Sequence, residues 1–172
     1  GKIRFSSKFS VDNSIYVSSS KNQSGYAGDT TIAANKVIYF ARRDVKSVEN
    51  VMSIKYSFTN RMGITLRARH YWSKVNPRQF YELQTPDIPF TRNVNQNYNY
   101  LSVDMVYNWQ FAQGSFFSIV WKDIGESFNR EFEKNYVKNL GNTIEGNQFN
   151  SLSVRVIYFL DYLTVKRKLR KS

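Results

Sequence analysis

The stretch that decides the fold class is LSVDMVYNWQF, residues 101–111. Every second residue of this stretch is apolar, and most of the residues between them are polar. Successive side chains of a β-strand point to opposite faces, so an alternation of this length predicts a strand with one apolar and one polar face. The apolar positions are Leu101, Val103, Met105, Tyr107, Trp109 and Phe111.

The same alternation recurs along the chain and predicts seven strands, at about 2–11, 14–20, 36–58, 62–73, 97–111, 116–124 and 151–163. The long third strand is expected to carry a bulge near Arg42, Arg43 and Asp44. Average strands in globular proteins have roughly five or six residues. Strands that cross a bilayer at a tilt need about nine to eleven. We therefore predict an all-β fold, an antiparallel transmembrane β-barrel.

Short and long connections alternate between these strands. Tight turns are predicted at 11–14, 59–61 and 112–115, and long polar connections at 21–35, 74–97 and 125–150. Outer-membrane barrels have short periplasmic turns and long outer loops, so this order places the C-terminus in the periplasm and the start of the first strand outside. Complete single-chain bacterial barrels have an even number of strands. We therefore expect the C-terminal portion of a larger barrel. The alternative is that the count of seven is wrong because one strand is overlooked or divided in two.

The composition excludes several classes of protein. The 172 residues include no Cys and one His, which excludes disulfide scaffolds, zinc ribbons, thiol nucleophiles and sites that need two histidines. Aromatic residues make up 16% of the chain, which argues against a disordered segment. No apolar run reaches 18 residues, so no transmembrane helix is expected. The formal net charge is +12.

The alternate positions along each strand form two sets, an apolar phase and a polar phase, which carry different side chains. Aromatic rings favour the membrane–water boundary, so the apolar phase is predicted to place lipid-facing or interfacial rings at Trp72, Tyr107, Trp109, Trp121, Tyr158 and Tyr162. The polar phase is predicted to place charges in the lumen, at Lys55, Arg67, Arg69, Asp104, Lys122, Arg155 and Asp161. A basic interior would favour anions in an open pore. The alternative is a plugged lumen in which Arg67 or Arg69 pairs with Asp104.

No arrangement of residues predicts catalysis. His70 lies on the apolar phase beside Trp72, where an interfacial ring is the simplest interpretation and a general base would need a partner within hydrogen-bond reach. A calcium site would need clustered oxygen ligands, and the acidic residues of the last long connection match no loop template; they are Glu126, Glu131 and Glu133, with Asn129. We predict no enzyme activity, no metal and no cofactor.

A set of short motifs resembles a known family. The motifs are ARRD (41–44), SVEN (47–50), NRMGI (60–64), LRARHYWS (66–73), VDMVYNW (103–109), GSFFSIVWK (114–122), NSLSV (150–154) and YFLDY (158–162). Together they resemble the C-terminal end of Bacteroidota outer-membrane proteins that carry an N-terminal family 9 carbohydrate-binding-like module followed by a β-barrel domain of unknown function. The resemblance implies an outer-membrane location and a barrel, and it implies no reaction.

These observations predict strands and loops of an outer-membrane barrel over residues 1–163 and a basic periplasmic tail over residues 164–172. The expected function is that of a channel, receptor or scaffold, linked to carbohydrate handling or to a larger envelope complex. Expected partners are outer-membrane lipid, the insertion machinery, the remaining N-terminal strands of the barrel, and envelope proteins that dock on the connections 74–97 and 125–150.

Two other functions are compatible with part of this sequence. A soluble basic β-domain that binds single-stranded nucleic acid would explain the charge, but it needs aromatic and basic side chains on the same face, whereas the alternation separates them. We therefore expect no nucleic-acid partner. A hydrolase at the outer rim of a barrel would need a base and a nucleophile, and no such pair is visible in the sequence.

Overall fold

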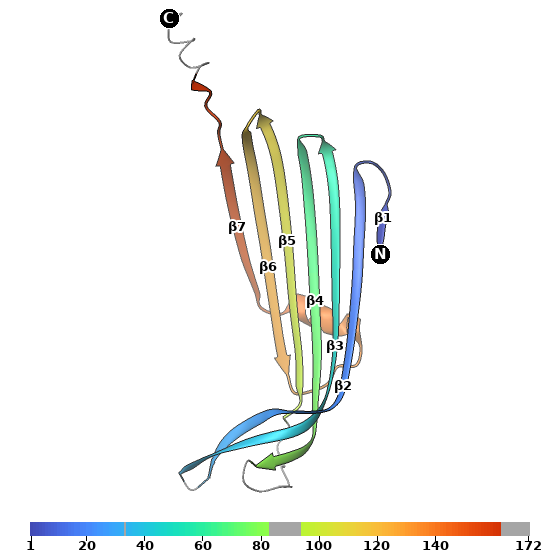
Figure 1. Ribbon diagram of the computed structural model, residues 1–172, viewed down its shortest axis with the longest axis vertical. Coiled ribbons are helices and arrows are strands. Elements are labelled where there is room, and N and C mark those ends of the chain that lie inside the picture. Colours follow the sequence, from blue (N-terminus) through green and yellow to red (C-terminus); the bar gives the residue numbers. More distant parts are fainter. Residues whose placement is uncertain (33, 83–93, 163–172) are drawn as a thin grey trace, which may run out of the picture.

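A single antiparallel β-sheet makes up most of the molecule (Figure 1). The computed structural model describes residues 1–32, 34–82 and 94–162. The strands pair in chain order, from β1 to β7. They are β1 (Lys2–Arg4), β2 (Phe9–Ile32), β3 (Asn35–Thr59), β4 (Met62–Glu82), β5 (Gln96–Ala112), β6 (Ser115–Asn129) and β7 (Gln148–Ile157), with one helix, α1 (Tyr136–Glu145), between β6 and β7.

The predicted all-β class, the number of strands and their antiparallel order are confirmed. Over the described residues β1 pairs with β2 and β7 pairs with β6, so the sheet is not closed. The three tight turns lie at one end of the sheet, and the C-terminal end of β7 points to the same end (Figure 1). The ten-residue polar helix is too short to cross a membrane, and the described ranges contain no helix that could.

The predicted tight turn at residues 11–14 is wrong. Residues 12–14 continue β2 and pair with residues 51–53 of β3. The first turn lies closer to the N-terminus, where the Ser6 hydroxyl oxygen accepts hydrogen bonds from the backbone N–H groups of Lys8 (3.1 Å) and Phe9 (3.0 Å). The preference of Asp and Asn for turns is a local tendency, and pairing with β3 outweighs it here.

The predicted long connection at 21–35 is also wrong, because these residues extend β2 and β3 into a hairpin. The pairing shifts register twice on the β2 side, between Ser20 and Gln23 and between Tyr26 and Gly28. Bulges of this kind bend and twist a strand pair. The end of the hairpin accordingly curves away from the straight part of the sheet (Figure 1).

The bulge predicted in the third strand near residues 42–44 lies instead on the neighbouring strand, β4. Arg42 lies opposite Gln79, but Arg43 lies opposite Pro77, so β4 carries one extra residue at this point. Pro77 lies beyond Val75, the last β4 residue that pairs with β5. A proline has no N–H group to donate to a neighbouring strand, and it is tolerated at bulges and on unpaired edges. The position of Pro77 at this bulge fits that preference.

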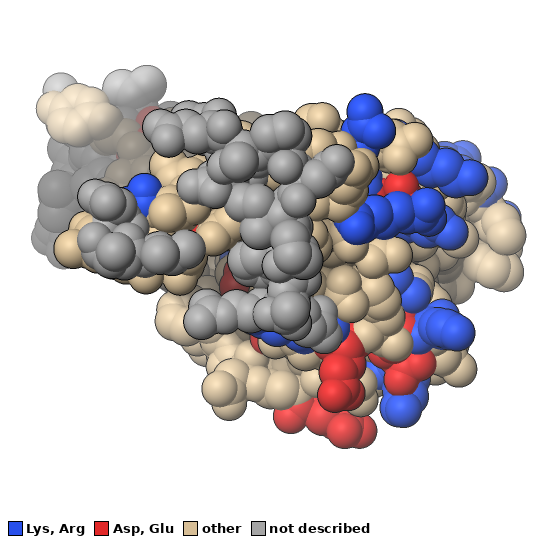
Figure 2. Space-filling view, turned by 90° about the horizontal axis from the view of Figure 1, so that it is seen from below, with Lys and Arg blue, Asp and Glu red and all other residues tan. Residues whose placement is uncertain are grey.

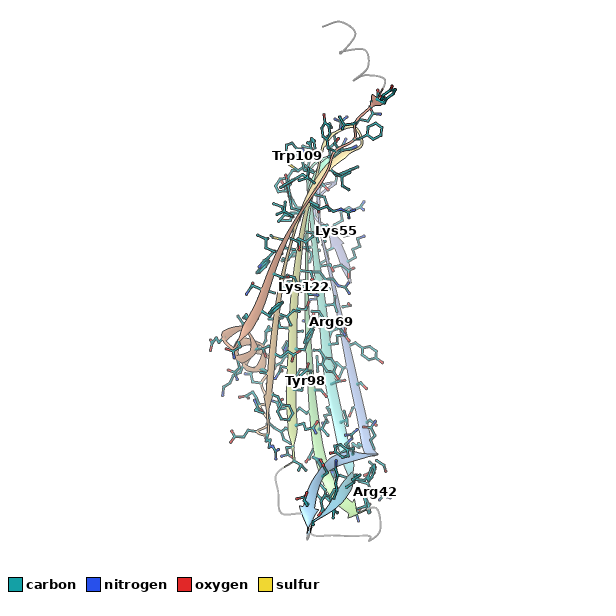
Figure 3. All side chains as sticks on the ribbon, turned by 90° about the vertical axis from the view of Figure 1, so that its left-hand side faces the viewer. Arg42, Lys55, Arg69, Tyr98, Trp109 and Lys122 are labelled. Atoms are coloured by element: carbon teal, nitrogen blue, oxygen red, sulfur yellow. The ribbon has the colours of Figure 1, made fainter. Side chains whose placement is uncertain are left out.

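The last third of the chain differs most from the prediction. The predicted connection at 125–150 contains the end of β6 and all of α1, and the last strand covers residues 148–157 instead of 151–163. Asn135 caps α1, because its side chain accepts hydrogen bonds from the backbone N–H groups of Val137 and Lys138. Figure 3 views the sheet nearly edge-on and shows α1 projecting from one side. The predicted tail at 164–172 lies outside the described residues.

Candidate functional site: two unlike faces and an anchored helix

One face of the sheet is apolar across all seven strands. Residues directly opposite each other on neighbouring strands share a face. The pairing therefore places an apolar side chain at each step of one row, in the order Ile3, Val11, Ile54, Leu66, Met105, Trp121 and Leu152. The next row toward the tight turns is also apolar from β2 to β7, with Phe9, Tyr56, Ile64, Tyr107, Ile119 and Val154. We call this surface the apolar face.

Aromatic rings join along the apolar face at its tight-turn end. Neighbouring ring centroids lie 4.9–6.5 Å apart in a series that runs through Phe5, Phe9, Tyr56, Phe58, Tyr107 and Phe117. A second series joins Trp109, Phe111 and Tyr158, with centroids 5.8 and 6.2 Å apart. We call these rings the aromatic belt. Tyr158 therefore reaches the belt although it lies just beyond β7, whereas Tyr162 lies further along the chain that leaves the sheet.

The apolar face is open over much of its extent. Leu152 and Val156 of β7 are 67% and 62% exposed, and Trp109 of β5 is 43% exposed. Large contiguous apolar surfaces are rare on soluble monomers and mark contacts with protein or membrane. This face is therefore a candidate surface for contact with protein or membrane.

The opposite face carries the predicted charges. Arg67, Asp104 and Lys122 lie directly opposite one another on β4, β5 and β6. The alternation places Lys55, Arg69 and Arg155 on the same face. We call it the charged face. Asp161 lies beyond β7, in the segment that leaves the sheet.

Ion pairs on the charged face differ from the predicted ones. Lys122 Nζ lies 3.8 Å from Asp104 Oδ1, and Arg69 Nε donates to Glu49 Oε1 at 2.8 Å. The predicted partners of Asp104 were Arg67 or Arg69, and Glu49 was not predicted as a partner of Arg69. The pairing of β3 with β4 explains Glu49, because it lies opposite Tyr71, two residues along β4 from Arg69.

A polar cluster fixes α1 to the apolar face. Asn97 and Asn99 of β5 are 0% and 1% exposed, and their amide groups donate to Asn139 Oδ1 at 3.1 and 3.2 Å. The Asn139 amide in turn donates to the backbone carbonyls of Glu133 and Asn135. Both ends of the Asn139 side chain are therefore hydrogen-bonded in a buried place, where an unpaired amide would be costly.

His70 and Trp72 lie under the start of α1. His70 Nδ1 and the Tyr136 hydroxyl are 2.9 Å apart, and Trp72 Nε1 donates to Asn97 Oδ1 at 2.7 Å. Both residues are on the predicted face, but the helix covers them: Trp72 is 9% exposed and His70 4%. The sequence contains a sign that a polar element covers this part of the apolar face, because Asn97 and Asn99 place polar groups on the apolar phase of β5.

Two of the residues that could have formed a calcium site, Glu133 and Asn129, have other partners. Glu133 Oε1 accepts a hydrogen bond from the Asn135 N–H, and its second oxygen lies 2.9 Å from Lys138 Nζ. Asn129 Oδ1 accepts from the Asn97 amide. In the described part of the chain, no three His, Asp or Glu side chains gather closely enough to hold a metal ion.

The chain matches a known protein family. The family model described as "Domain of unknown function (DUF5916)" matches residues 1–169. The chain belongs to the DUF5916 family. The DUF5916 match includes every strand and α1. No curated protein and no solved structure matches the chain.

Proposed function

We propose that this chain is the C-terminal part of a β-barrel in the outer membrane of a Gram-negative bacterium, with the apolar face toward lipid and the charged face toward the lumen. The observation that carries the proposal is the apolar row that crosses all seven strands while charged residues occupy the other face. A soluble sheet with this pattern would need a second apolar layer on its open face.

The height of the apolar face supports the proposal. On β5 it extends from Leu101 to Phe111, and the described strand contains all of these residues. Ten residue steps of about 3.4 Å give about 34 Å along the strand. A tilt of about 40° reduces this to about 26 Å along the membrane normal, close to the apolar band of about 25 Å in outer-membrane barrels.

Both borders of the apolar band carry side chains that suit a membrane–water interface. The aromatic belt lies at the tight-turn end, where we place the periplasmic interface. At the other border, α1 buries Asn139 and Thr143 and exposes Val137 (73%) and Ile144 (54%). Lys138, Asn142 and Glu145 are exposed beside these apolar residues, and a helix surface of mixed polar and apolar side chains suits the headgroup boundary of a bilayer.

The open edges of the sheet support membership of a larger barrel. In the described ranges, β1 pairs with β2 only at Ser10, Val11 and Asp12, so most of β2 has a strand on one side only. Tyr16 of this edge is 70% exposed. Unpaired edges of this length attract further strands. We propose that N-terminal strands of a longer protein occupy both edges, β2 and β7.

The charged face supports a role as a channel, receptor or scaffold. Acidic partners offset some of its basic residues, as in the Asp104–Lys122 pair. The resemblance to Bacteroidota envelope proteins supports the proposed location, and the link to carbohydrate handling rests on it. Binding of nucleic acid fits less well, because Trp109 and Trp121 lie on the face opposite to Arg67 and Lys122.

Site-directed spin labelling tests the orientation of the faces. These 172 residues lack Cys, so single Cys substitutions at residues 101–111 can each carry one nitroxide in a full-length protein whose remaining part has been freed of Cys, reconstituted into liposomes. We expect the odd-numbered positions from 103 to 111 to be accessible to oxygen dissolved in lipid and the even-numbered positions to lack this accessibility. Leu101 is left out because it is only 7% exposed. If the odd-numbered positions are inaccessible to both oxygen and a water-soluble nickel complex, they face a protein core and the proposal is wrong.

A further inference from the structure

A basic hollow of about 350 Å³ lies near the start of α1, at the end of the sheet away from the tight turns. Lys46 of β3, Lys74 of β4 and Lys134, just before α1, line it together with Phe132. Figure 2 views the molecule from this end and shows Lys and Arg side chains gathered over its right-hand part, with acidic side chains among them.

The positive charge of this hollow is not balanced locally. Asp44 also lines the hollow, but it pairs with Arg78. Within residues 1–32, 34–82 and 94–162, no carboxylate lies within ion-pair distance of the three lysines, Lys46, Lys74 and Lys134. The three amines therefore have no ion-pair partner in the described residues, and an anion could pair with them. Lysine acts as a point charge toward phosphate groups, and a cluster of lysines attracts them.

The lysines also influence one another. Partial burial lowers the pKa of Lys74, Glu133 opposes this effect, and the charges of Lys46 and Lys134 lower the pKa further. The same three lysines line the hollow, so their charges repel one another at one place. A bound anion would relieve this repulsion, which makes binding more favourable.

An apolar groove adjoins the basic hollow. Val17, Val48 and Trp72 lie opposite one another on β2, β3 and β4, and they line a second hollow of about 270 Å³. Lys46 and Lys74 line this hollow too, two residues further toward the long connections. Lys74 Nζ lies 4.2 Å from the centre of the Trp72 ring, a cation–π contact that joins the basic and apolar parts.

We propose that these two hollows bind a phosphorylated lipid of the outer leaflet, with its phosphate on Lys46, Lys74 and Lys134 and an acyl chain along Val17, Val48 and Trp72. The proposal rests on the proposed membrane orientation. The order of the two hollows favours a lipid over free phosphate. The apolar residues lie nearer the lipid-facing band and the lysines lie beyond them, which matches the order of an acyl chain and its headgroup in a membrane.

Native mass spectrometry and binding titration in nanodiscs test this site. The full-length protein is titrated with lipid A carrying two phosphates and with the same lipid lacking phosphate. We compare the wild type, K46Q/K74Q/K134Q, and a control that removes three charges from the opposite face, K55Q/K122Q/R155Q. We expect the first variant to bind phosphorylated lipid about tenfold more weakly or worse, and the control to bind it like the wild type.

Three results would overturn the site: unchanged affinity in K46Q/K74Q/K134Q, an equal loss in the control, or equal binding of both lipids by the wild type. Competition by millimolar inorganic phosphate that displaces the lipid completely would instead assign the hollow to free phosphate. Lys134 lies outside every strand, so Lys134→Gln alone provides a variant with little risk to folding; a loss of about fivefold is expected.

A gel-mobility measurement on the same samples separates this proposal from the membrane proposal. A closed barrel resists detergent until heated, so its band shifts on boiling. A shift in all variants together with unchanged lipid affinity overturns only the lipid site. The absence of a shift in the wild type overturns the barrel, and the lipid site with it.

Discussion

Asn97 and Asn139 connect the sheet to its helix. The Asn97 amide donates to Asn139 Oδ1 at 3.1 Å, and the two side chains are 0% and 1% exposed. Asn97 also accepts from Trp72 Nε1. One buried asparagine on β5 therefore contacts both β4 and α1. Because each of these groups is buried, the position of α1 depends on their hydrogen bonds.

The first prediction concerns this contact. Asn139→Ala removes the acceptor of the Asn97 and Asn99 amides and leaves them buried without that partner. A buried polar group left unpaired costs about 1–3 kcal/mol, so we expect a loss in the free energy of unfolding of at least this size. Urea titration in bilayers measures it, and proteolysis within 130–147 should become faster.

Asn142→Ala is the matched control, because Asn142 lies on the same helix and is exposed. We expect it to change the free energy of unfolding by less than about 0.5 kcal/mol. Equal effects of the two substitutions would show that helix propensity, and not the buried contact, determines the result.

The sequence predicted the parts of this fold that depend on alternation. Residues 101–111 and 62–73 are strands because their side chains alternate, and the number, order and antiparallel pairing of the strands followed from such segments. The alternation also placed Lys55, Arg67 and Lys122 on one face and Trp109 and Trp121 on the other. Such placement needs only the two-residue period of a strand.

Features that depend on contacts between distant residues were missed. The hairpin beyond Ser20 is rich in Ser, Gly and Asn, and pairing with β3 makes it a strand against these preferences. α1 is short and polar, so its stability comes from the cluster around Asn139 and not from an apolar stripe. The partner of Arg69 could not be read from the sequence, because Glu49 lies 20 residues away.

The second prediction concerns the apolar face. Met105 lies in the middle of the proposed membrane band, and Val106 is its neighbour on the charged face. Met105→Arg should destabilise the folded protein in bilayers by about 2–4 kcal/mol, as for a charge facing lipid at the midplane. Val106→Arg should cost clearly less, and the heat-modifiable fraction measures both. A larger loss from Val106→Arg would reverse the assignment of the faces.

The third prediction concerns two glycines with opposite expected effects. Gly114, in the turn between β5 and β6, has φ of 72°, and a Cβ there would lie 2.9 Å from the Phe159 Cβ. Gly114→Ala should destabilise the protein by at least about 1–2 kcal/mol. In α1, a Cβ at Gly141 would meet no atom within 4 Å, so Gly141→Ala should stabilise the protein by about 0.5–1 kcal/mol. Equilibrium unfolding measures both. A Gly114→Ala variant as stable as the wild type would contradict the turn geometry, and a destabilised Gly141→Ala variant would contradict the open position in α1.

The last prediction concerns the dependence of α1 on pH. The hydrogen bond from the Asn135 N–H, followed by that from Lys138, lowers the pKa of Glu133 below its ordinary value. Its contribution to stability is therefore present above the pKa of the unfolded chain and is lost as the pH falls through the lowered pKa. Nuclear magnetic resonance of the Glu133 carboxyl carbon should give a low midpoint, and Lys138→Gln should raise it. Glu145→Gln, at the other end of α1, should leave the Glu133 midpoint unchanged. If Lys138→Gln has no effect on that midpoint, the ion pair at the start of α1 does not form in solution.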